Sequence, residues 1–523
     1  MKRLSIHMKS VRTRTTLLLV LGMIAMSTCA QAQQGADDPL TAFIKRGMDL
    51  WRVPGAAVAV VDADTVQYQR GFGTATDPDV LSAGAAATPV DEHTLFAIAS
   101  TTKAMVATGI LMLIDDGLLT LDDRVVDYIP ELHFRDPLLT AQTTVRDLLT
   151  HRTGLPSTDF WTFFQQMPMD EQIIRLQSVS AVAGLRARHI YQNTMYELAG
   201  LLIERVSGQT WDALLRERLW RPIGMTETFA ARGRIPDTLT HVAPHFVIDD
   251  DIRLADWDLP AETADAAGSV WSSIHDMSLW VRFLLAGGVT ADGTRLVSEA
   301  QLTRMFTPQS LIARRDFYPT TELTEPQWLS YGLGWFQQDF RGHKVDFHTG
   351  SLSGLIALVG IDRDRNRGVV ILANRDHAEF RHALLWQVMD ERAANEKPDW
   401  NGMVHDLYQR RDAEREVEWE ETLSKRQANT RPGLKLDAYA SRYHSPLNGT
   451  VTVARNGREL ELRTARITLN MSHWHHETWL IEYKPWELRE FATFHIGPDG
   501  AVSGLEAMGD HFRRVTESTG ETH

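Results

Sequence analysis

The residues with the clearest chemical potential are a serine and a lysine three positions apart. Ser100 and Lys103 stand at the start of residues 104–116, which are apolar on nearly every face and end at Gly117, a pattern that predicts a buried helix with a glycine cap. Side chains three residues apart share one face of a helix, so the amine can reach the hydroxyl. The free N–H groups and the positive dipole end at a helix start favour an alkoxide.

A serine hydroxyl is a poor nucleophile until a neighbouring group takes its proton, and a lysine made less basic by burial can share that task. The spacing therefore predicts a nucleophilic Ser100 that is activated by Lys103. A helix-capping serine beside a lysine that extends to solvent explains the same two residues, because Ser-x-x-Lys occurs by chance in most long chains. The neighbouring motifs decide between these interpretations.

Four further motifs follow in the order found in a known enzyme superfamily. Together with residues 96–103 (FAIASTTK), they are residues 148–156 (LLTHRTGLP), 191–193 (YQN), 196–200 (YELAG) and 348–350 (HTG). Over residues 40–395 the chain resembles the serine β-lactamase and penicillin-binding-protein superfamily, especially its class C-like branch of esterases and D-amino-acid peptidases. Residues 431–515 resemble the small lipocalin-like β-barrel that is appended to some members.

The resemblance implies a role for each motif residue. Ser100 would attack a carbonyl carbon and form an acyl-enzyme, and Lys103 would keep the proton network of the nucleophile poised. Tyr191 would act as the general base or, held by nearby positive charge, as the phenolate that passes the proton to the leaving group, with His348 as a candidate assistant. Asn193 would hydrogen-bond either the substrate amide or the lysine.

The last motif, residues 348–350, is expected on an edge strand, where the resemblance implies that it contacts the substrate. The backbone N–H groups of Ser351 and Ser100 would form the oxyanion hole, Thr349 would contact the substrate, and Gly350 would let it approach the strand closely. Family members often carry lysine in place of His348. A permanent cation there would hold the carboxylate of a penicillin or a peptidoglycan stem, whereas histidine is mostly neutral at pH 7, so efficient β-lactamase or DD-transpeptidase activity is in doubt.

Strand patterns are confined to the two ends of the large domain, and helical patterns fill the middle. A hairpin and later strands are predicted, followed by a helix, at residues 56–61, 66–72, 344–348, 355–361, 368–372 and 377–394. We therefore expect an α+β fold (an α/β sandwich), in which an antiparallel sheet built from both chain ends is flanked by helices and a helical insert. A cleft between sheet and insert would be a natural site.

The chain is expected to divide into four segments: a signal peptide at 1–32, a serine hydrolase domain at 33–395, a charged helical linker at 396–430 and an antiparallel β-domain at 431–518. The signal peptide is indicated by a basic start, ten uncharged residues at 17–26 and the sequence Ala30-Gln31-Ala32. Ten apolar residues cannot span a hydrocarbon core of about 30 Å as a helix. We therefore expect a periplasmic or secreted protein with no stable membrane span after cleavage. An uncleaved anchor and lipid attachment at Cys29 stay open.

Composition narrows the chemistry further. With 54 Lys and Arg against 68 Asp and Glu, the formal net charge of −14 offers no general basic field for nucleic acid. A single cysteine excludes disulfide frameworks, Cys-rich zinc sites and iron–sulfur clusters. His473 and His475 lack a third ligand nearby, and residues 362–366 resemble a solvated hairpin loop more than a calcium site, so no metal is expected. No phosphate loop or Gly-x-Ser-x-Gly elbow is present, and no cofactor is expected.

These observations predict an exported serine hydrolase that cleaves an amide or ester bond through an acyl-enzyme. Small or unusual peptides, including D-residue and linearised cyclic ones, rank level with short-chain esters as substrates, and β-lactams rank below both. A penicillin-binding sensor or cell-wall binding module that acylates without turnover is the alternative, and a structural envelope protein is a third. The β-domain could narrow the cleft mouth or mediate homo-oligomer contacts, and the aromatic residues 160–164 either line the cleft or pack in the interior.

Overall fold

A computed structural model describes residues 38–82, 85–255, 265–393 and 395–515. The expected signal peptide and Cys29 lie outside the described residues. Contacts divide the chain into two units, Met1–Gly47 and Met48–His523. Helix α2 (Pro39–Trp51) begins in the first unit, and the elements that follow it belong to the second.

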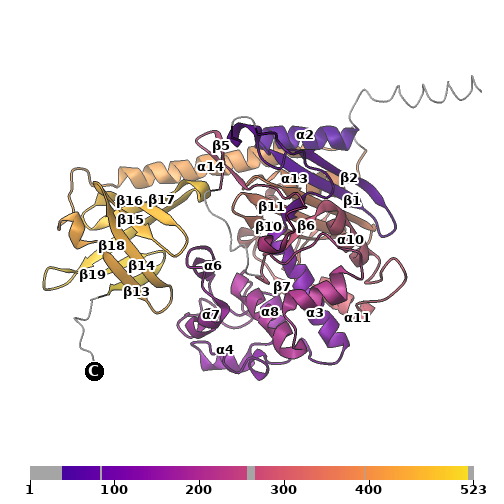
Figure 1. The fold of residues 1–523 in the computed structure, drawn as a ribbon, viewed down its shortest axis with the longest axis horizontal. Helices are drawn as coiled ribbons and strands as arrows, with labels where there is room; N and C mark the ends of the chain where they lie inside the picture. The colour runs from indigo at the N-terminus through magenta and orange to yellow at the C-terminus, as the bar shows by residue number, and fades with distance from the viewer. Residues whose placement is uncertain (1–37, 83–84, 256–264, 394, 516–523) are drawn as a thin grey trace, which may run out of the picture. The chain divides into compact units, whose positions relative to one another are not determined.

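The large domain contains an eight-stranded antiparallel sheet (Figure 1). Its order, β2-β1-β12-β11-β10-β9-β8-β7, brings the two ends of the domain together because β1 pairs with β12 from Ala56↔Ala373 to Val61↔Gly368. The strands are β1 (Gly55–Val61), β2 (Val66–Gly73), β7 (Ser310–Leu311), β8 (Leu329–Tyr331), β9 (Phe336–Phe340), β10 (His343–Leu352), β11 (Leu355–Asp362) and β12 (Arg367–Ala373).

Helices cover both faces of this sheet. A Cβ atom added to Gly368 would strike Val281 of α10 (Ile274–Leu285), and one added to Gly360 would strike Leu385 of α13 (Phe380–Met389). Gly360 pairs with Val369, the neighbour of Gly368, so the two glycines face opposite sides of the sheet. The two helices therefore enclose the sheet, which explains why every residue of β1 and β11 is buried.

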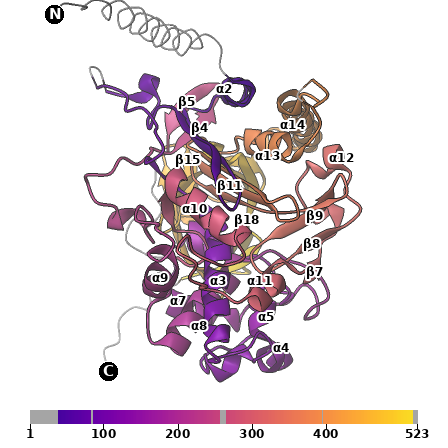
Figure 2. The ribbon, with the colours of Figure 1, turned by 90° about the vertical axis from the view of Figure 1, so that its right-hand side faces the viewer.

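Along the chain, a helical region separates the two groups of strands, and its helices gather below the sheet in the view of Figure 2. Its central helix α3 (Thr102–Asp115) is buried almost throughout and is followed by Gly117 at φ +74°, as the sequence predicts. Gly109 of α3 allows close packing against α8 (Asn193–Ser207) and α9 (Trp211–Leu215). The region also contains α4 (Pro137–Gln142), α5 (Val145–Leu149), α6 (Asp159–Phe163), α7 (Met169–Leu176) and α11 (Glu299–Phe306), and the short α12 (Thr321–Thr324) lies between β7 and β8.

Several short elements complete this domain. Two small sheets pair β3 (Leu95–Ala97) with β6 (Trp271–Ser273) and β4 (His245–Ile248) with β5 (Asp251–Leu254). The short helical turns of the whole chain are η1 (Pro78–Val80), η2 (Ala99–Thr101), η3 (Val125–Asp127), η4 (Arg216–Trp220), η5 (Arg232–Arg234), η6 (Arg314–Asp316), η7 (Leu436–Ala438) and η8 (Lys484–Trp486).

Helix α14 (Trp400–Ser424) leads from the large domain to a closed eight-stranded barrel. The barrel closes because β13 pairs with β20, Tyr443 lying opposite Arg514. Aromatic and aliphatic side chains, among them Trp479 and Phe494, fill its interior. The strands are β13 (Ser441–Ser445), β14 (Gly449–Asn456), β15 (Glu459–Arg463), β16 (Thr468–His475), β17 (Thr478–Tyr483), β18 (Leu488–Ile496), β19 (Val502–Ala507) and β20 (Asp510–Arg514).

The predicted fold class is confirmed, with two differences. Strands β7, β8 and β9 were not expected, because they are only two, three and five residues long and carry little alternation. The prediction that residues 348–350 lie on an edge strand is wrong, because β10 lies between β9 and β11. The pairing with β9 nevertheless ends at Phe347↔Phe336, so the later half of β10 extends beyond that neighbour. No helix in the described ranges combines the length and the apolar composition that a transmembrane span needs.

Candidate active site

The predicted nucleophile lies in a strained turn directly before α3. Ser100 belongs to the short helical turn η2, and the preceding Ala99 adopts φ +47°, which non-glycine residues rarely do. Backbone from two other segments packs closely on this turn: a Cβ atom on Gly350 would lie 2.4 Å from the Ile98 carbonyl oxygen, and one on Gly268 would lie 3.3 Å from the Ala99 carbonyl carbon. The surrounding structure therefore holds the turn in place.

This packing corrects one sequence-based expectation. Gly350 was expected to make room for the substrate, but Ile98 and Ala99 fill the space where its side chain would be. A Cβ atom there would also lie 3.1 Å from the backbone nitrogen of Ser100. The glycine is needed so that strand β10 can approach the nucleophile turn, and this approach places the residue before Ser351 against the backbone of Ser100.

Lys103 is fully buried and lies within hydrogen-bonding distance of Ser100. Its Nζ is 2.9 Å from Ser100 Oγ, 2.8 Å from Asn193 Oδ1 and 2.6 Å from the carbonyl oxygen of Ala267. The last two atoms can only accept hydrogen bonds, whereas the serine hydroxyl can also donate. A neutral amine would therefore direct both its hydrogens to Asn193 and Ala267 and its lone pair to Ser100 Oγ.

Burial lowers the pKa of Lys103 from 10.5 to about 8, against the opposing influence of nearby carboxylates. These carboxylates belong to Asp265, Asp159 and Glu197. Glu197 is itself hydrogen-bonded to Asp265, and burial raises its pKa well above the usual value. The amine is thus set so that an appreciable part of it is neutral near pH 7.

Tyr191 and Asn193 both lie next to Ser100 and Lys103. The Tyr191 side chain is hydrogen-bonded to Ser100, and Lys103 Nζ lies 5.1 Å from the centre of its ring. Burial raises the pKa of Tyr191 well above 10, which disfavours the phenolate and leaves a neutral phenol that can relay a proton. Of the two partners considered for Asn193, the lysine is the one observed, and Asn193 Nδ2 donates to Asp159 Oδ1 at 2.8 Å.

His348 is buried and neutral. Its Nδ1 lies 2.6 Å from the carbonyl oxygen of Thr349, an acceptor, so Nδ1 carries the proton and Nε2 accepts from the hydroxyl of Tyr331 at 2.9 Å. Burial, and secondly the charge of Lys103, lowers the pKa of His348 to about 3. The His348 and Tyr191 ring centres are 6.1 Å apart, and the Nε2 atom is engaged by Tyr331, so no direct hydrogen bond supports the expected assistance to Tyr191.

The remaining strand residues are held by side chains from outside the strand. Thr349 Oγ1 lies 2.6 Å from the Tyr318 hydroxyl. Arg381 of α13 donates to the Gly350 carbonyl oxygen at 2.7 Å and to Ser351 Oγ at 2.9 Å. Its guanidinium is also paired with Glu379, at 2.9 Å, and both side chains are buried. The strand beyond His348 is therefore fixed by a buried ion pair whose positive charge is already balanced.

Sequence reasoning missed several residues of this site. Asp159, Glu197 and Asp265 surround the lysine, and Tyr331 partners His348. A buried lysine requires nearby acids, so Glu197, inside the motif at 196–200, was within reach of that argument. Asp159 and Asp265 lie outside every motif, and no local pattern points to them.

The histidines in the barrel do not gather as metal ligands. A bulge between His473 and His475 breaks the shared face that the sequence suggested. His473 Nε2 lies 2.9 Å from the His476 carbonyl oxygen, and His476 Nε2 lies 2.7 Å from Gln427 Oε1. These contacts tie the segment after α14 to the barrel.

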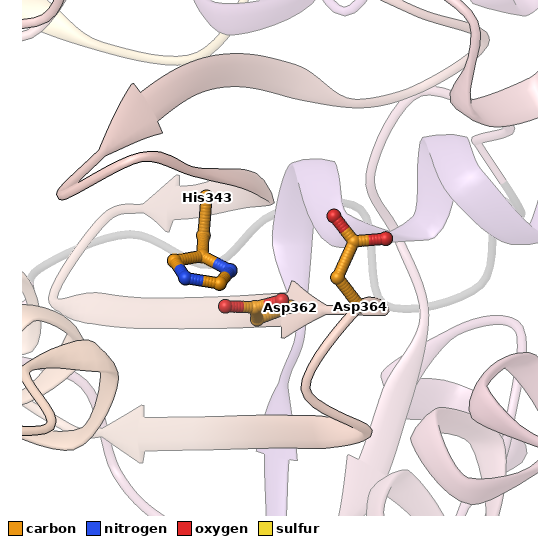
Figure 3. Close-up of side chains that lie close together, drawn as sticks. All are labelled: His343, Asp362 and Asp364. Atoms are coloured by element: carbon orange, nitrogen blue, oxygen red, sulfur yellow. The ribbon is translucent and has the colours of Figure 1, made fainter.

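One group in the described residues has the composition of a metal site. Ligand atoms of His343, at the start of β10, lie within 4.8 Å of those of Asp362 and Asp364, at the turn between β11 and β12, and these two lie equally close to each other (Figure 3). However, Arg365 Nε lies 3.7 Å from Asp362 Oδ2, and the Arg365 backbone N–H donates to Asp362 Oδ1 at 3.1 Å. Because the guanidinium already supplies positive charge to the buried carboxylate, we assign no cation to this group.

Comparison with known proteins identifies two family matches. Residues 40–394 match the family described as Beta-lactamase, and residues 425–516 match the Domain of unknown function DUF3471. Unguisins hydrolase ungD of Aspergillus violaceofuscus is 27% identical over 460 residues, which are 81% of this chain and 77% of that protein. Penicillin-binding protein 4 of Amycolatopsis lactamdurans is 28% identical over 312 residues, 58% of this chain and 76% of that protein.

Solved structures show the same fold. The octameric penicillin-binding protein homologue from Pyrococcus abyssi aligns with a TM-score of 0.57 at 19% identity, covering 91% of this chain and 98% of that one. The crystal structure of SurE with D-Leu aligns with a TM-score of 0.52 at 19% identity, over the same shares of the two chains.

Proposed function

Because this chain belongs to the Beta-lactamase family, we propose that it is an exported serine hydrolase that cleaves an amide or ester bond through an acyl-enzyme on Ser100. The observation that carries this proposal is the environment of Lys103. Two fixed acceptors, Asn193 Oδ1 and the Ala267 carbonyl oxygen, take the hydrogens of the neutral amine and direct its lone pair to the serine hydroxyl. This is the arrangement that a general base needs.

In the proposed reaction, Lys103 takes the proton of Ser100 as its Oγ forms a bond to the substrate carbonyl carbon. The backbone N–H groups of Ser100 and Ser351 stabilise the resulting oxyanion. Tyr191, as a neutral phenol, passes a proton from the lysine ammonium to the leaving amine or alcohol as the scissile bond breaks. A water molecule then attacks the acyl-enzyme, gives its proton back through the same groups and releases the acid, and Ser100 is regenerated.

The surroundings of His348 favour a substrate without a carboxylate at this strand. His348 is neutral, and the charge of Arg381 is balanced by Glu379, so neither offers a free cation to the anion of a penicillin or a stem peptide. We therefore propose a small or unusual peptide, ranked level with a short-chain ester, and rank β-lactam turnover lower. The similarity to Unguisins hydrolase ungD supports hydrolysis as the reaction class.

A periplasmic or secreted location is part of the proposal and depends on the expected signal peptide at residues 1–32. N-terminal sequencing of protein purified from cell fractions tests it. A mature chain that begins after Ala32 supports export, and an intact chain in the cytosolic fraction contradicts it.

Labelling with a fluorophosphonate tests the nucleophile, with the wild type compared with Ser100→Ala. We expect a labelled wild type and an unlabelled variant, and a screen of p-nitrophenyl esters and of D- and L-peptide amides then identifies the substrate class. Labelling that persists in Ser100→Ala contradicts the assignment. A stoichiometric burst without steady-state release on every substrate would instead favour the sensor that acylates without turnover.

A further inference from the structure

We propose that the C-terminal barrel positions the reacting lysine through helix α6, so that the barrel helps to set the rate at which Ser100 is acylated. This inference rests on the function proposed above and assigns a role to the domain of unknown function. Helix α6 (Asp159–Phe163) contacts the active site with one end and the barrel with the other.

The N-terminal end of α6 is hydrogen-bonded to the N-terminal end of α8, the helix that carries Asn193. Asp159 Oδ1 accepts a hydrogen bond from Asn193 Nδ2 at 2.8 Å. The hydroxyls of Thr158 and Thr194 lie 2.6 Å apart, and both threonines are buried. Two adjacent residues of α6 and its cap therefore bind two adjacent residues of α8.

The contact with Asp159 decides which way the Asn193 amide faces. An asparagine amide has an acceptor end and a donor end of nearly the same shape, and only its partners distinguish them. Asp159 can accept but not donate, so it takes the NH2 group and leaves Oδ1 for Lys103 Nζ at 2.8 Å. Asp159 is therefore a positioning residue that acts on the lysine through Asn193.

The other side of α6 is held by the barrel. Trp161, fully buried, donates from Nε1 to Asn448 Oδ1 in the turn between β13 and β14 at 3.1 Å. Gln165 Nε2 donates to the carbonyl oxygen of Asn448 at 3.0 Å, and the Arg466 backbone N–H donates to that of Phe164 at 3.1 Å. The aromatic residues 160–164 thus pack against the barrel, as shown also by the Phe164–Trp486 ring contact at 5.3 Å.

Helix α6 cannot hold its own position. It has five residues and no side-chain cap, and helices this short are not stable by themselves in water. Its geometry must come from its neighbours, which are α8, the barrel and the core of the large domain, in which Trp161 packs. Loosening the barrel contact therefore loosens the constraint on Asn193, and through it the direction of the Lys103 lone pair.

Asp159→Asn and Trp161→Phe test this coupling. Asp159→Asn keeps the shape but can offer its own NH2 group to Asn193, and Trp161→Phe removes the N–H that binds the barrel. We expect the rate of fluorophosphonate acylation to fall about tenfold in Asp159→Asn and about threefold to tenfold in Trp161→Phe, the size of one lost buried hydrogen bond. Trp419→Phe is the matched control, because Trp419 contacts barrel residue Trp474 at 5.7 Å and not α6.

Two further measurements separate positioning from general loss of structure. Because the charge of Asp159 raises the pKa of Lys103, Asp159→Asn should move the acidic limb of the pH–rate profile to lower pH, whereas Trp161→Phe should leave it in place. The double variant should lose little more than Asp159→Asn alone, since both act through one contact chain. The other titratable or charged groups facing Lys103 are unchanged in both variants: Glu197, Asp265, Tyr191, Tyr196, His151 and His348.

The outcomes are distinct. If the wild type labels at Ser100 but both variants acylate at its rate, the barrel coupling is wrong and the proposed function stands. The coupling is also wrong if Trp161→Phe lowers only the unfolding temperature, or if Trp419→Phe slows acylation as much as Trp161→Phe. If the wild type is not labelled at Ser100, the proposed function fails and this inference fails with it.

Discussion

The pH dependence of acylation is the sharpest consequence of the buried lysine. With a pKa of about 8, roughly one Lys103 side chain in ten is neutral at pH 7, against about one in three thousand at the ordinary pKa of 10.5. Burial therefore supplies about 300 times more free base at neutral pH, at a cost of about 3 kcal/mol for holding the charged form.

The acylation rate should rise with pH, because only the neutral form of Lys103 can take the proton of Ser100. Below pH 8 the lysine is mostly protonated, so the acylation rate should fall about tenfold for each further unit of pH, and above pH 8 it should level off. The second-order rate of fluorophosphonate acylation, followed from pH 5.5 to 9.5 in buffers of constant ionic strength, measures this curve. The same burial penalty weakens the fold below pH 8 and is relieved as pH rises towards 10.5.

Lys103→Arg keeps the positive charge but cannot give up its proton, so at pH 8 and above, where much of the wild-type lysine is neutral, acylation should fall by about 10² to 10⁴-fold. Lys344→Arg is the matched control, since Lys344 binds Asp346 at 2.8 Å and does not reach Ser100. A wild-type rate that is flat from pH 6 to 9, or a Lys103→Arg variant within tenfold of the wild type at pH 8 and above, would contradict the role of Lys103 as the general base.

Three further changes test other parts of the site. Tyr191→Phe should lower acylation at least about a hundredfold, because it removes a positioned proton carrier, and a loss of less than tenfold would count against that role. Gly350→Ala places a methyl group 2.4 Å from the Ile98 carbonyl oxygen and should cost about 1–3 kcal/mol of unfolding free energy in a urea titration, together with slower labelling; an unchanged midpoint would contradict the packing. Arg381→Met leaves Glu379 buried without its partner and should cost about 3–5 kcal/mol, read from the same titration, with unaltered stability as the contrary result.

The site residues that are close together in the sequence could be predicted, because the chemistry requires a fixed short spacing between them. Ser100 and Lys103 are one helical turn apart, so a motif captures them, and the buried helix behind them follows from its apolar composition. The carboxylates of Asp159, in α6, and of Asp265, between β5 and β6, act on the same lysine from distant segments of the chain, and their approach depends on tertiary packing. No local pattern records that packing.

The protonation state of Tyr191 depends on its surroundings and could not be predicted from the residue type. A tyrosine beside a lysine suggests a stabilised phenolate, but complete burial of Tyr191 outweighs the neighbouring charge and keeps the phenol protonated. The expectation of an edge strand at residues 348–350 was wrong because strand β9 was not foreseen. This strand has only five residues with two adjacent glutamines, which give a weak sequence signal, and it pairs with only the first half of β10.

The closure of the barrel determines how its contacts with α6 are lost when the protein unfolds. Since β13 pairs with β20, each described strand of the barrel has two hydrogen-bonded neighbours, and none can detach without opening the ring. Such a ring melts as one cooperative unit. On warming, the contribution of the barrel to the acylation rate should consequently be lost in one step, at the temperature where the barrel unfolds, and not gradually over many degrees.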